Sequence, residues 1–591
     1  MMPSYKKCFQ EMEKRKDFHF DLNFLKASLR IKSKLFIEGS YYAILFVVFN
    51  LIISISSEVV GYYLGLIPGR MYSALLSKDV DSFWFILWSG SLMYVGKCFL
   101  LAALSSASWL LYLCFRKNLT TSLTKAIFYA KTTAYKLFCL ESLDNLDQRI
   151  TQDVDKMCTI LANTLLPAVM ICPFVIVYYT YKTYVTAGIY GCGIIYGYFF
   201  IGTCINKMLI SPLSKWTARV EKVEGDYRYK YATLRDNIEQ ISLYGGNEFE
   251  KDSTYTYLNK ILKAQFYLGS WIFPNTMFQT FFSYYGGLLS YAIQFIAIFW
   301  WHIYDDLSPQ DLAKVISNNA FVYIYLVNSF TRLSDTSIAI GEMAGLLQRI
   351  DEVFVACRGL RYSTNITHDK DNNLPLITVN NVSISTTSAK LIINKLNIMS
   401  NGNLLILGPS GAGKSSLVRM FLDVWRIDEG IVNINMASDQ ISVIPQKGYF
   451  PTGKLTLYEQ ICFPKIITPG TPIKYEEEEI IFELIGKLHL NSVLARVGGL
   501  HIKPNFEYNN VLTPGELQRL SFIRALINKP KLVFLDESTN SVSNDVEEIM
   551  YTYLIKNDIR VVSVGHRDTL LKWHAQVLIL DGTGGYTCRD I

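Results

Sequence analysis

The chain has 591 residues, of which 50% are hydrophobic and only 18% are charged, and its formal net charge is +6. A mean hydropathy of +0.20 excludes a disordered protein and indicates membrane-spanning segments. The length predicts more than one domain, and the small net charge gives no reason to expect a nucleic-acid partner.

The N-terminal residues 1–38 are mixed and basic, and Met1–Lys16 lacks the apolar core of a signal peptide. We therefore expect a cytosolic N-terminal segment. Residues 18–32 form either an amphipathic surface helix or part of a loosely ordered tail. The 11 cysteines show neither C-x-x-C nor zinc-ligand spacing, which indicates free thiols in a reducing compartment.

Apolar stretches long enough to cross a bilayer follow, since a spanning helix needs roughly 20 residues. We predict six spans, with a tight turn at Lys182–Tyr184 between the third and the fourth. They make up a transmembrane domain over residues 39–357 that contacts membrane lipid. The spans cover approximately residues 41–67, 83–115, 160–181, 185–205, 266–301 and 315–333.

Basic residues in the loops predict the orientation. Two long loops, after the second and the fourth span, are rich in Lys and Arg, whereas the short loops on the other side hold only Arg70, Lys78 and Lys182. The positive-inside rule places the long loops and both termini in the cytosol. A polar linker over residues 358–375 then leads to a soluble α/β domain over residues 376–591.

The soluble domain contains a phosphate-binding loop. The apolar run 404–407 predicts a strand and Ser415–Phe421 a helix, and Gly408-x-x-x-x-Gly413-Lys414-Ser415 lies between them. Glycines let backbone N–H groups point at phosphate oxygens, and the helix N-terminus adds partial positive charge. A chance glycine-rich turn is the alternative, which this context disfavours. The predicted ATP-binding residues here are Gly408, Pro409, Ser410, Gly411, Ala412, Gly413, Lys414, Ser415 and Ser416.

Further polar residues follow predicted strands. Gln446 ends the strand that begins at Ile441, Asp536 and Glu537 end the strand from Lys531, and His566 follows the strand 561–564. With Ser415, the side chains of Asp536 and Gln446 are suited to Mg²⁺, and Glu537 is suited to polarising an attacking water. A structural role remains the alternative for an isolated glutamine or histidine.

Thr513, Pro514, Gly515 and Glu516 precede a predicted helix over residues 517–527. Their types predict a capping box, in which Thr513 is the N-cap and Pro514 the first helical residue. Taken alone, the segment is more simply a well-capped helix than a site for a γ-phosphate.

Together these motifs resemble the nucleotide-binding domain of ATP-binding-cassette (ABC) transporters. The resemblance implies Walker A at Lys414 and Ser415, the signature at Thr513–Glu516 and Walker B at Asp536 and Glu537. It also implies catalytic roles for Gln446 and His566, ATP and Mg²⁺ as cofactors, and an exporter-type fold. One cassette per chain implies a half-transporter that functions as a homodimer.

Departures from the family pattern resemble subfamily D. Pro514 replaces a residue with an N–H in the signature, and Ile384–Thr387 lacks the aromatic residue that usually stacks on adenine. The segments Ser541–Glu547 and Asn145–Asp153 are similar to subfamily D motifs. Others, such as Gly65–Pro68 and Ser563–Arg567, are closest to its lysosomal cobalamin-exporting branch. That branch implies transport from lumen to cytosol and a lysosomal membrane protein as targeting partner.

Two alternatives remain open at this level. One is a fatty acyl-CoA transporter of the peroxisomal branch, which the short N-terminal segment disfavours. The other is a membrane scaffold or ATP-gated regulator with little transport. For the location, the ER or the peroxisome remains an alternative to the lysosome. Glu58 and Lys97 lie within predicted spans, where a charge is either functional or simply paired.

Overall fold

The structure is a computed structural model that describes residues 22–36, 41–129, 132–138, 143, 146–360, 366–367, 375–385, 391–425, 427–467 and 475–591. Two compact units make up the described chain. The helical unit comprises the described residues of 22–126 and 142–355, and the α/β unit those of 127–141 and 356–591. We describe each unit separately.

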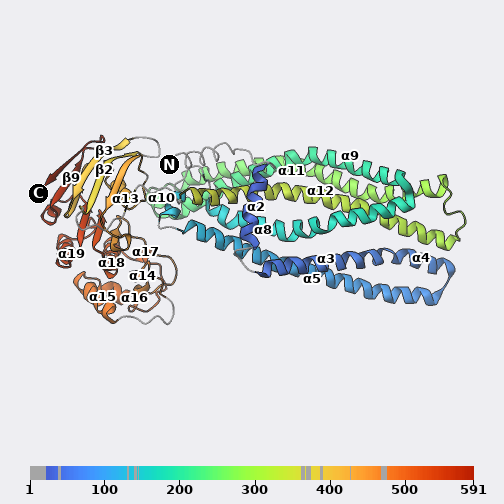
Figure 1. Ribbon diagram of the computed structural model, residues 1–591, viewed down its shortest axis with the longest axis horizontal. Helices are drawn as coiled ribbons and strands as arrows, with labels where there is room; N and C mark the ends of the chain where they lie inside the picture. The colour runs from blue at the N-terminus through green and yellow to red at the C-terminus, as the bar shows by residue number, and fades with distance from the viewer. Residues whose placement is uncertain are drawn as a thin grey trace. The chain divides into compact units, whose positions relative to one another are not determined.

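The helical unit consists of long helices, of which α9, α11 and α12 run alongside one another while α2 crosses them (Figure 1). Among the described residues of this unit, the π-helical segments η1, η2 and η3 interrupt the regular helices. In chain order the elements are α2 (Leu22–Phe36), α3 (Tyr41–Gly65), α4 (Ile67–Ser77), α5 (Val80–Ile127), α7 (Leu146–Gln148), η1 (Arg149–Asp153), α8 (Val154–Thr159), η2 (Ile160–Leu165), α9 (Leu166–Asp236), α10 (Ile238–Leu243), α11 (Asn247–Phe295), η3 (Ile296–Trp300) and α12 (Pro309–Leu360).

Among the described residues, four helical stretches are long and apolar enough to cross a membrane: Tyr41–Ser77, Val80–Ile127, Leu146–Asp236 and Asn247–Trp300. Five of the six predicted spans fall within them. The sixth, at 315–333, lies in α12, a 52-residue helix that is not among the four. The prediction of an exporter-type helical transmembrane domain is confirmed.

The chain reverses within α9 at Gly188, whose φ of 63° and ψ of −165° are not helical. Thr180 Oγ1 and Tyr196 Oη are 3.0 Å apart, and Cys192 Sγ lies 3.8 Å from the Thr180 carbonyl oxygen. Such contacts are impossible in one straight helix. The predicted turn at Lys182–Tyr184 is therefore wrong: those residues continue the helix, and the turn occurs where glycine permits that backbone conformation.

Ion pairs fasten the N-terminal helix and the η1 segment to the end of α12. Arg30 Nε donates to Asp351 Oδ1 at 2.8 Å, and Arg149 Nη1 is 2.6 Å from Glu352 Oε2. Asp153 lies 3.2 Å from Arg349 Nε. The described part of the predicted N-terminal segment is thus a helix attached by charge and by buried Ala27 and Ile31, although Phe18 and Phe20 lie outside the described residues.

The described residues of the α/β unit form two sheets. A four-stranded sheet has the order β1-β5-β2-β3, and a six-stranded sheet the order β10-β9-β4-β8-β7-β6. The strands are β1 (Ile366–Thr367), β2 (Ile377–Ser385), β3 (Leu391–Ser400), β4 (Leu404–Leu407), β5 (Glu429–Ile434), β6 (Ile441–Ile444), β7 (Leu532–Asp536), β8 (Arg560–Val564), β9 (Gln576–Leu580) and β10 (Tyr586–Asp590). The predicted α/β domain is confirmed.

Helices pack against these sheets around an apolar core that includes Phe534, Leu405 and Ile523. β1 lies within the stretch expected to be a linker and pairs with β5. The helices and 3₁₀ turns of the unit are α6 (Thr133–Phe138), α13 (Lys414–Phe421), η4 (Ser438–Gln440), α14 (Leu457–Cys462), α15 (Tyr475–Lys487), α16 (Asn491–Val497), α17 (Tyr508–Val511), α18 (Pro514–Ile527), α19 (Asn544–Lys556) and η5 (Asp568–Trp573).

A loop between predicted spans supplies α6 to the α/β unit. Lys136 on α6 forms an ion pair with Asp423, just after α13, with Nζ and Oδ1 3.0 Å apart. Both side chains are largely shielded from solvent. This ion pair attaches the loop between the second and third predicted spans to the chain just after α13, the helix that follows the phosphate-binding loop.

Gly188→Ala should destabilise the protein. A Cβ at this position would lie 2.6 Å from Trp301 Cη2, and the backbone conformation there costs a non-glycine residue about 1–3 kcal/mol. We expect a clearly lower melting temperature for the purified chain in detergent. Gly193→Ala is the matched control, because a Cβ there meets nothing within 4 Å. Equal melting temperatures for the two variants would contradict the assigned turn.

Candidate functional site

The site forms at one edge of the six-stranded sheet. β4, β6, β7, β8 and β9 are parallel, so the carboxyl ends of these strands meet at a common edge. Loops that follow β4, β6, β7 and β8 therefore come together there, as ligand sites do in open parallel sheets. These loops carry the phosphate-binding loop, Gln446, Glu537 and His566.

The phosphate-binding loop makes the tight turn that the sequence predicts. Gly413 caps α13 with a φ of 94°, and a Cβ there would lie 2.2 Å from Ile392 Cγ2. Only glycine fits this backbone and this contact. The other predicted loop residues lie in the turn between β4 and α13 or in the first turn of α13. They are Gly408, Pro409, Ser410, Gly411, Ala412 and Ser416.

Lys414 is buried inside its own loop. Its Nζ donates to the carbonyl oxygens of Gly408 at 2.9 Å and Pro409 at 3.0 Å. Burial lowers the pKa of Lys414, and the nearby carboxylates of Glu537 and Asp536 oppose that effect. The ammonium group is thus held beside the loop's backbone by neutral acceptors, which a phosphate could replace.

Ser415 and Asp536 are joined directly. The Ser415 hydroxyl donates to Asp536 Oδ1 at 2.9 Å. Burial raises the pKa of Asp536, and the Ser415 hydrogen bond acts in the opposite direction. A buried carboxylate with a single hydroxyl partner is an oxygen pair of the kind that Mg²⁺ prefers.

The side chains at this edge fit Mg²⁺ bound together with nucleotide phosphates. Mg²⁺ usually takes one or two protein carboxylates and completes its shell with phosphate oxygens and water. Within the part of the chain that the structure describes, no group of three or more His, Cys, Asp or Glu side chains could hold a metal by itself. Ser415, Asp536 and Gln446 are the side chains available for it.

The predicted catalytic residues Gln446 and His566 both contact Glu537. Gln446 Nε2 donates to Glu537 Oε2 at 2.9 Å, and His566 Nε2 lies 3.4 Å from Glu537 Oε1. The backbone of Glu537 has a φ of 47°, which is rare for this residue type, and its N–H donates to the Val564 carbonyl oxygen at 3.0 Å. Strained backbone of this kind is typical of functional sites. Gln446, Glu537 and His566 are therefore together, as the sequence predicts.

Thr513–Glu516 forms the predicted capping box. Thr513 Oγ1 accepts from the Glu516 N–H at 3.3 Å, and Glu516 Oε2 accepts from the Thr513 N–H at 2.8 Å. Pro514 begins α18, and Gly515 follows it in the first turn. Among the described residues, no hydrogen bond or ion pair joins this segment to the phosphate-binding loop. One chain therefore does not bring the two predicted ATP-binding segments together.

Sequence reasoning missed two residues of the site, Asn540 and Arg567. Asn540 Nδ2 donates to Glu537 Oε2 at 3.1 Å. Arg567 directly follows His566 in the sequence, and this position was the one signal that could have identified it as a residue of the site. Its guanidinium donates to the carbonyl oxygens of Asn540 at 3.3 Å and Val542 at 3.1 Å, and to buried Glu547 at 3.1 Å. Arg567 thus connects the segment that follows Glu537 to the loop that carries His566.

Two family models match the chain. One, described as ABC transporter transmembrane region 2, covers residues 34–299, and the other, described as ABC transporter, covers residues 393–540. The second model spans both the phosphate-binding loop and Glu537. An ATP-binding domain of this type uses ATP, and its hydrolysis is coupled to transport.

Curated relatives match almost the whole chain. Lysosomal cobalamin transporter ABCD4 of Mus musculus is 33% identical over 97% of this chain and 97% of its own length. Its Homo sapiens counterpart shows the same identity and coverage. ATP-binding cassette sub-family D member 3 of Homo sapiens is 28% identical over 81% of this chain and 76% of its own length.

Arg567→Gln should destabilise the α/β unit. Glu547 has 2% of its surface exposed, and a hydrogen bond to a charged group contributes about 1.5–3 kcal/mol. We expect a lower melting temperature of the full chain and, because His566 loses its anchored neighbour, slower ATP hydrolysis. Arg560→Gln, at an exposed position on β8, is the control. If both variants melt like the unsubstituted protein, Arg567 does not hold this segment.

Proposed function

This chain belongs to the D subfamily of ABC transporters, and we propose that it is a homodimeric half-transporter that moves cobalamin from the lysosomal lumen to the cytosol. The observation that carries the substrate proposal is the 33% identity, over 97% of the chain, to the lysosomal cobalamin transporters of mouse and human. The chain is a membrane protein with an ABC-type ATPase domain.

In the proposed mechanism, the backbone of Gly408–Gly413 and the Lys414 ammonium hold the ATP phosphates. Ser415, Asp536 and Gln446 would hold Mg²⁺, which would neutralise charge on those phosphates. Glu537 orients the attacking water, and His566 keeps the Glu537 side chain in position. The contacts of Glu537 with Gln446 and His566 support these roles.

A homodimer would complete the ATP site. Thr513–Glu516 caps α18 but makes no hydrogen bond to the phosphate-binding loop within the described part of its own chain. We propose that the same segment of the partner subunit closes over the bound γ-phosphate, using the N-terminus of its α18. Pro514 removes one N–H donor, so the Gly515 N–H and the Thr513 hydroxyl remain for that contact.

Coupling between ATP and transport requires a mechanical link. The Lys136–Asp423 ion pair supplies one candidate, because it joins a loop of the membrane region to the helix region after the phosphate-binding loop. ATP binding would favour the closed cassette dimer, and hydrolysis would release it. The cassette and both termini are proposed to lie in the cytosol, with a polytopic lysosomal membrane protein as targeting partner.

Glu537→Gln should bind ATP but hydrolyse it very slowly. The amide keeps the shape of the side chain while it removes the charge that polarises water, and such losses commonly slow turnover by a factor of about 100 or more. Nucleotide binding and phosphate release by the purified chain measure the two steps. Turnover close to that of the unsubstituted protein would show that another group activates the water.

Substrate stimulation of ATP hydrolysis tests the proposed cargo. In liposomes we expect cobalamin to raise the ATPase rate of the purified chain, with Glu537→Gln as the blank. A long-chain acyl-CoA, the alternative substrate class, should have little effect. Stimulation by acyl-CoA alone would contradict the cobalamin proposal, and ATP hydrolysis that no substrate changes and no flux accompanies would favour a regulator.

A further inference from the structure

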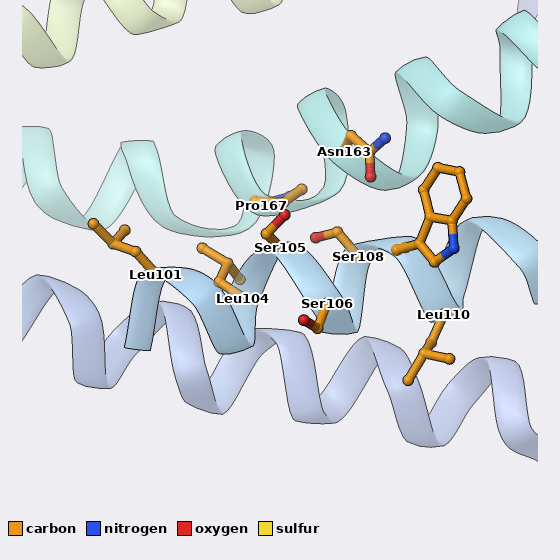
Figure 2. Close-up of a pocket in the computed structure, with 9 residues that line it drawn as sticks. Leu101, Leu104, Ser105, Ser106, Ser108, Leu110, Asn163 and Pro167 are labelled. Carbon is orange, nitrogen blue, oxygen red and sulfur yellow. The ribbon is translucent and has the colours of Figure 1, made fainter. Parts of the chain in front are cut away.

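An open cavity of about 550 Å³ lies between α3, α5, the η2–α9 segment and α12 in the helical unit. A second cavity of about 690 Å³ adjoins it, because both are lined by Leu101, Leu104, Asn163 and Pro167. Figure 2 shows Ser105 on the side of its helix that faces Pro167, with Ser106 on the opposite side. The two cavities thus lie on either side of shared wall residues, and both have apolar and polar walls.

Charged residues of both signs line the first cavity. The Glu58 carboxylate accepts a hydrogen bond from the Tyr325 hydroxyl, and Arg332 Nη1 lies 3.3 Å from Glu58 Oε1. Glu58 and Arg332 thus satisfy each other. Glu58 is therefore paired, which is one of the two roles expected for it. Because Glu58 also lines the cavity, a functional role remains open.

Lys97 differs from Glu58, because its partners are neutral. Its Nζ donates to the hydroxyl of Ser57 at 2.8 Å and to the Ser57 carbonyl oxygen. In the described residues no carboxylate forms an ion pair with Lys97, and Asp335, which also lines the cavity, has no ion pair either. Within the described chain, Lys97 and Asp335 therefore form no ion pair beside this space, and the Glu58 carboxylate attracts Lys97 only from beyond ion-pair distance.

A buried polar atom points independently to a ligand. Ser54 lines the same cavity with only 6% of its surface exposed, and its hydroxyl has no hydrogen-bond partner in the described chain. Buried hydroxyls without partners are rare and costly. Asn163 also lines this cavity and belongs to the π-helical segment η2, and such segments occur frequently at functional sites.

We propose that this cavity binds the transported ligand and that Lys97 holds a single anionic group of it, such as one phosphate diester. Asp335, Ser54 and Asn163 supply hydrogen-bond donors and acceptors for neutral amides or hydroxyls of the same ligand. Charges within a membrane region are costly and are found along substrate pathways. The inference rests on the proposed function, which it deepens by naming residues and ligand charge.

The balance of charge decides between ligand classes. Lys97 and Arg332 are matched in number by Glu58 and Asp335, so the lining has no net charge. Coenzyme A carries several phosphate charges, whereas Lys97 is the one cation of this lining that forms no ion pair within the described residues. A ligand with one anionic group among many amides, as in cobalamin, fits this lining better.

Lys97→Gln tests the assigned anion contact. We expect the cobalamin concentration for half-maximal ATPase stimulation in liposomes to rise about tenfold, the value of one charged hydrogen bond. Lys97→Arg should recover most of the response. Lys117→Gln, an exposed position on the same helix, is the control for a lost charge. A response of Lys97→Gln equal to that control would overturn the proposal.

Asp335→Asn tests the charge balance with a second readout. It leaves one cation in excess, so free coenzyme A should inhibit the cobalamin-stimulated ATPase at a concentration about fivefold lower than in the unsubstituted protein. An unchanged inhibitory concentration would overturn the charge argument even if Lys97→Gln fails to fold. Absence of cobalamin stimulation in the unsubstituted protein would instead reject the proposed function itself.

Discussion

The Glu537 carboxylate is the contact on which the ATP site depends. It accepts from Gln446 and Asn540 and pairs with His566, so the loops after three parallel strands meet at one side chain. Its N–H bond to Val564 holds it in an uncommon backbone conformation. This arrangement is possible only because β6, β7 and β8 are parallel neighbours whose carboxyl ends lie together.

Charged side chains in the helical unit differ in whether they form ion pairs. In the ion pair between Arg149 and Glu352, which fastens η1 to α12, both partners are buried and satisfy each other. Beside the cavity, Glu58 and Arg332 also pair, but Lys97 relies on neutral acceptors from Ser57. A cation without an ion pair, in a region that matches a transmembrane family model, carries a free-energy cost that a ligand can offset.

Local sequence patterns predicted the parts of the site that local geometry creates. Gly413 and Lys414 follow a strand and begin a helix, and the Thr513–Glu516 capping box needs only its own residues. Arg567 escaped prediction because its partners, including Val542 and Glu547, become neighbours only through the fold. The predicted turn at 182–184 is wrong because polar residues there resemble a loop. The chain instead turns at Gly188, where glycine permits the non-helical backbone conformation.

The sequence by itself determined the family, the two kinds of domain and the strand-end positions of Gln446, Glu537 and His566, since these follow from apolar patterning and motif spacing. Only the tertiary structure decided which side chains touch Glu537, that Glu58 pairs with Arg332, and that Lys97 lines a cavity without an ion pair in the described chain. These contacts join residues from distant parts of the chain, so helix packing and strand order decide them rather than local sequence.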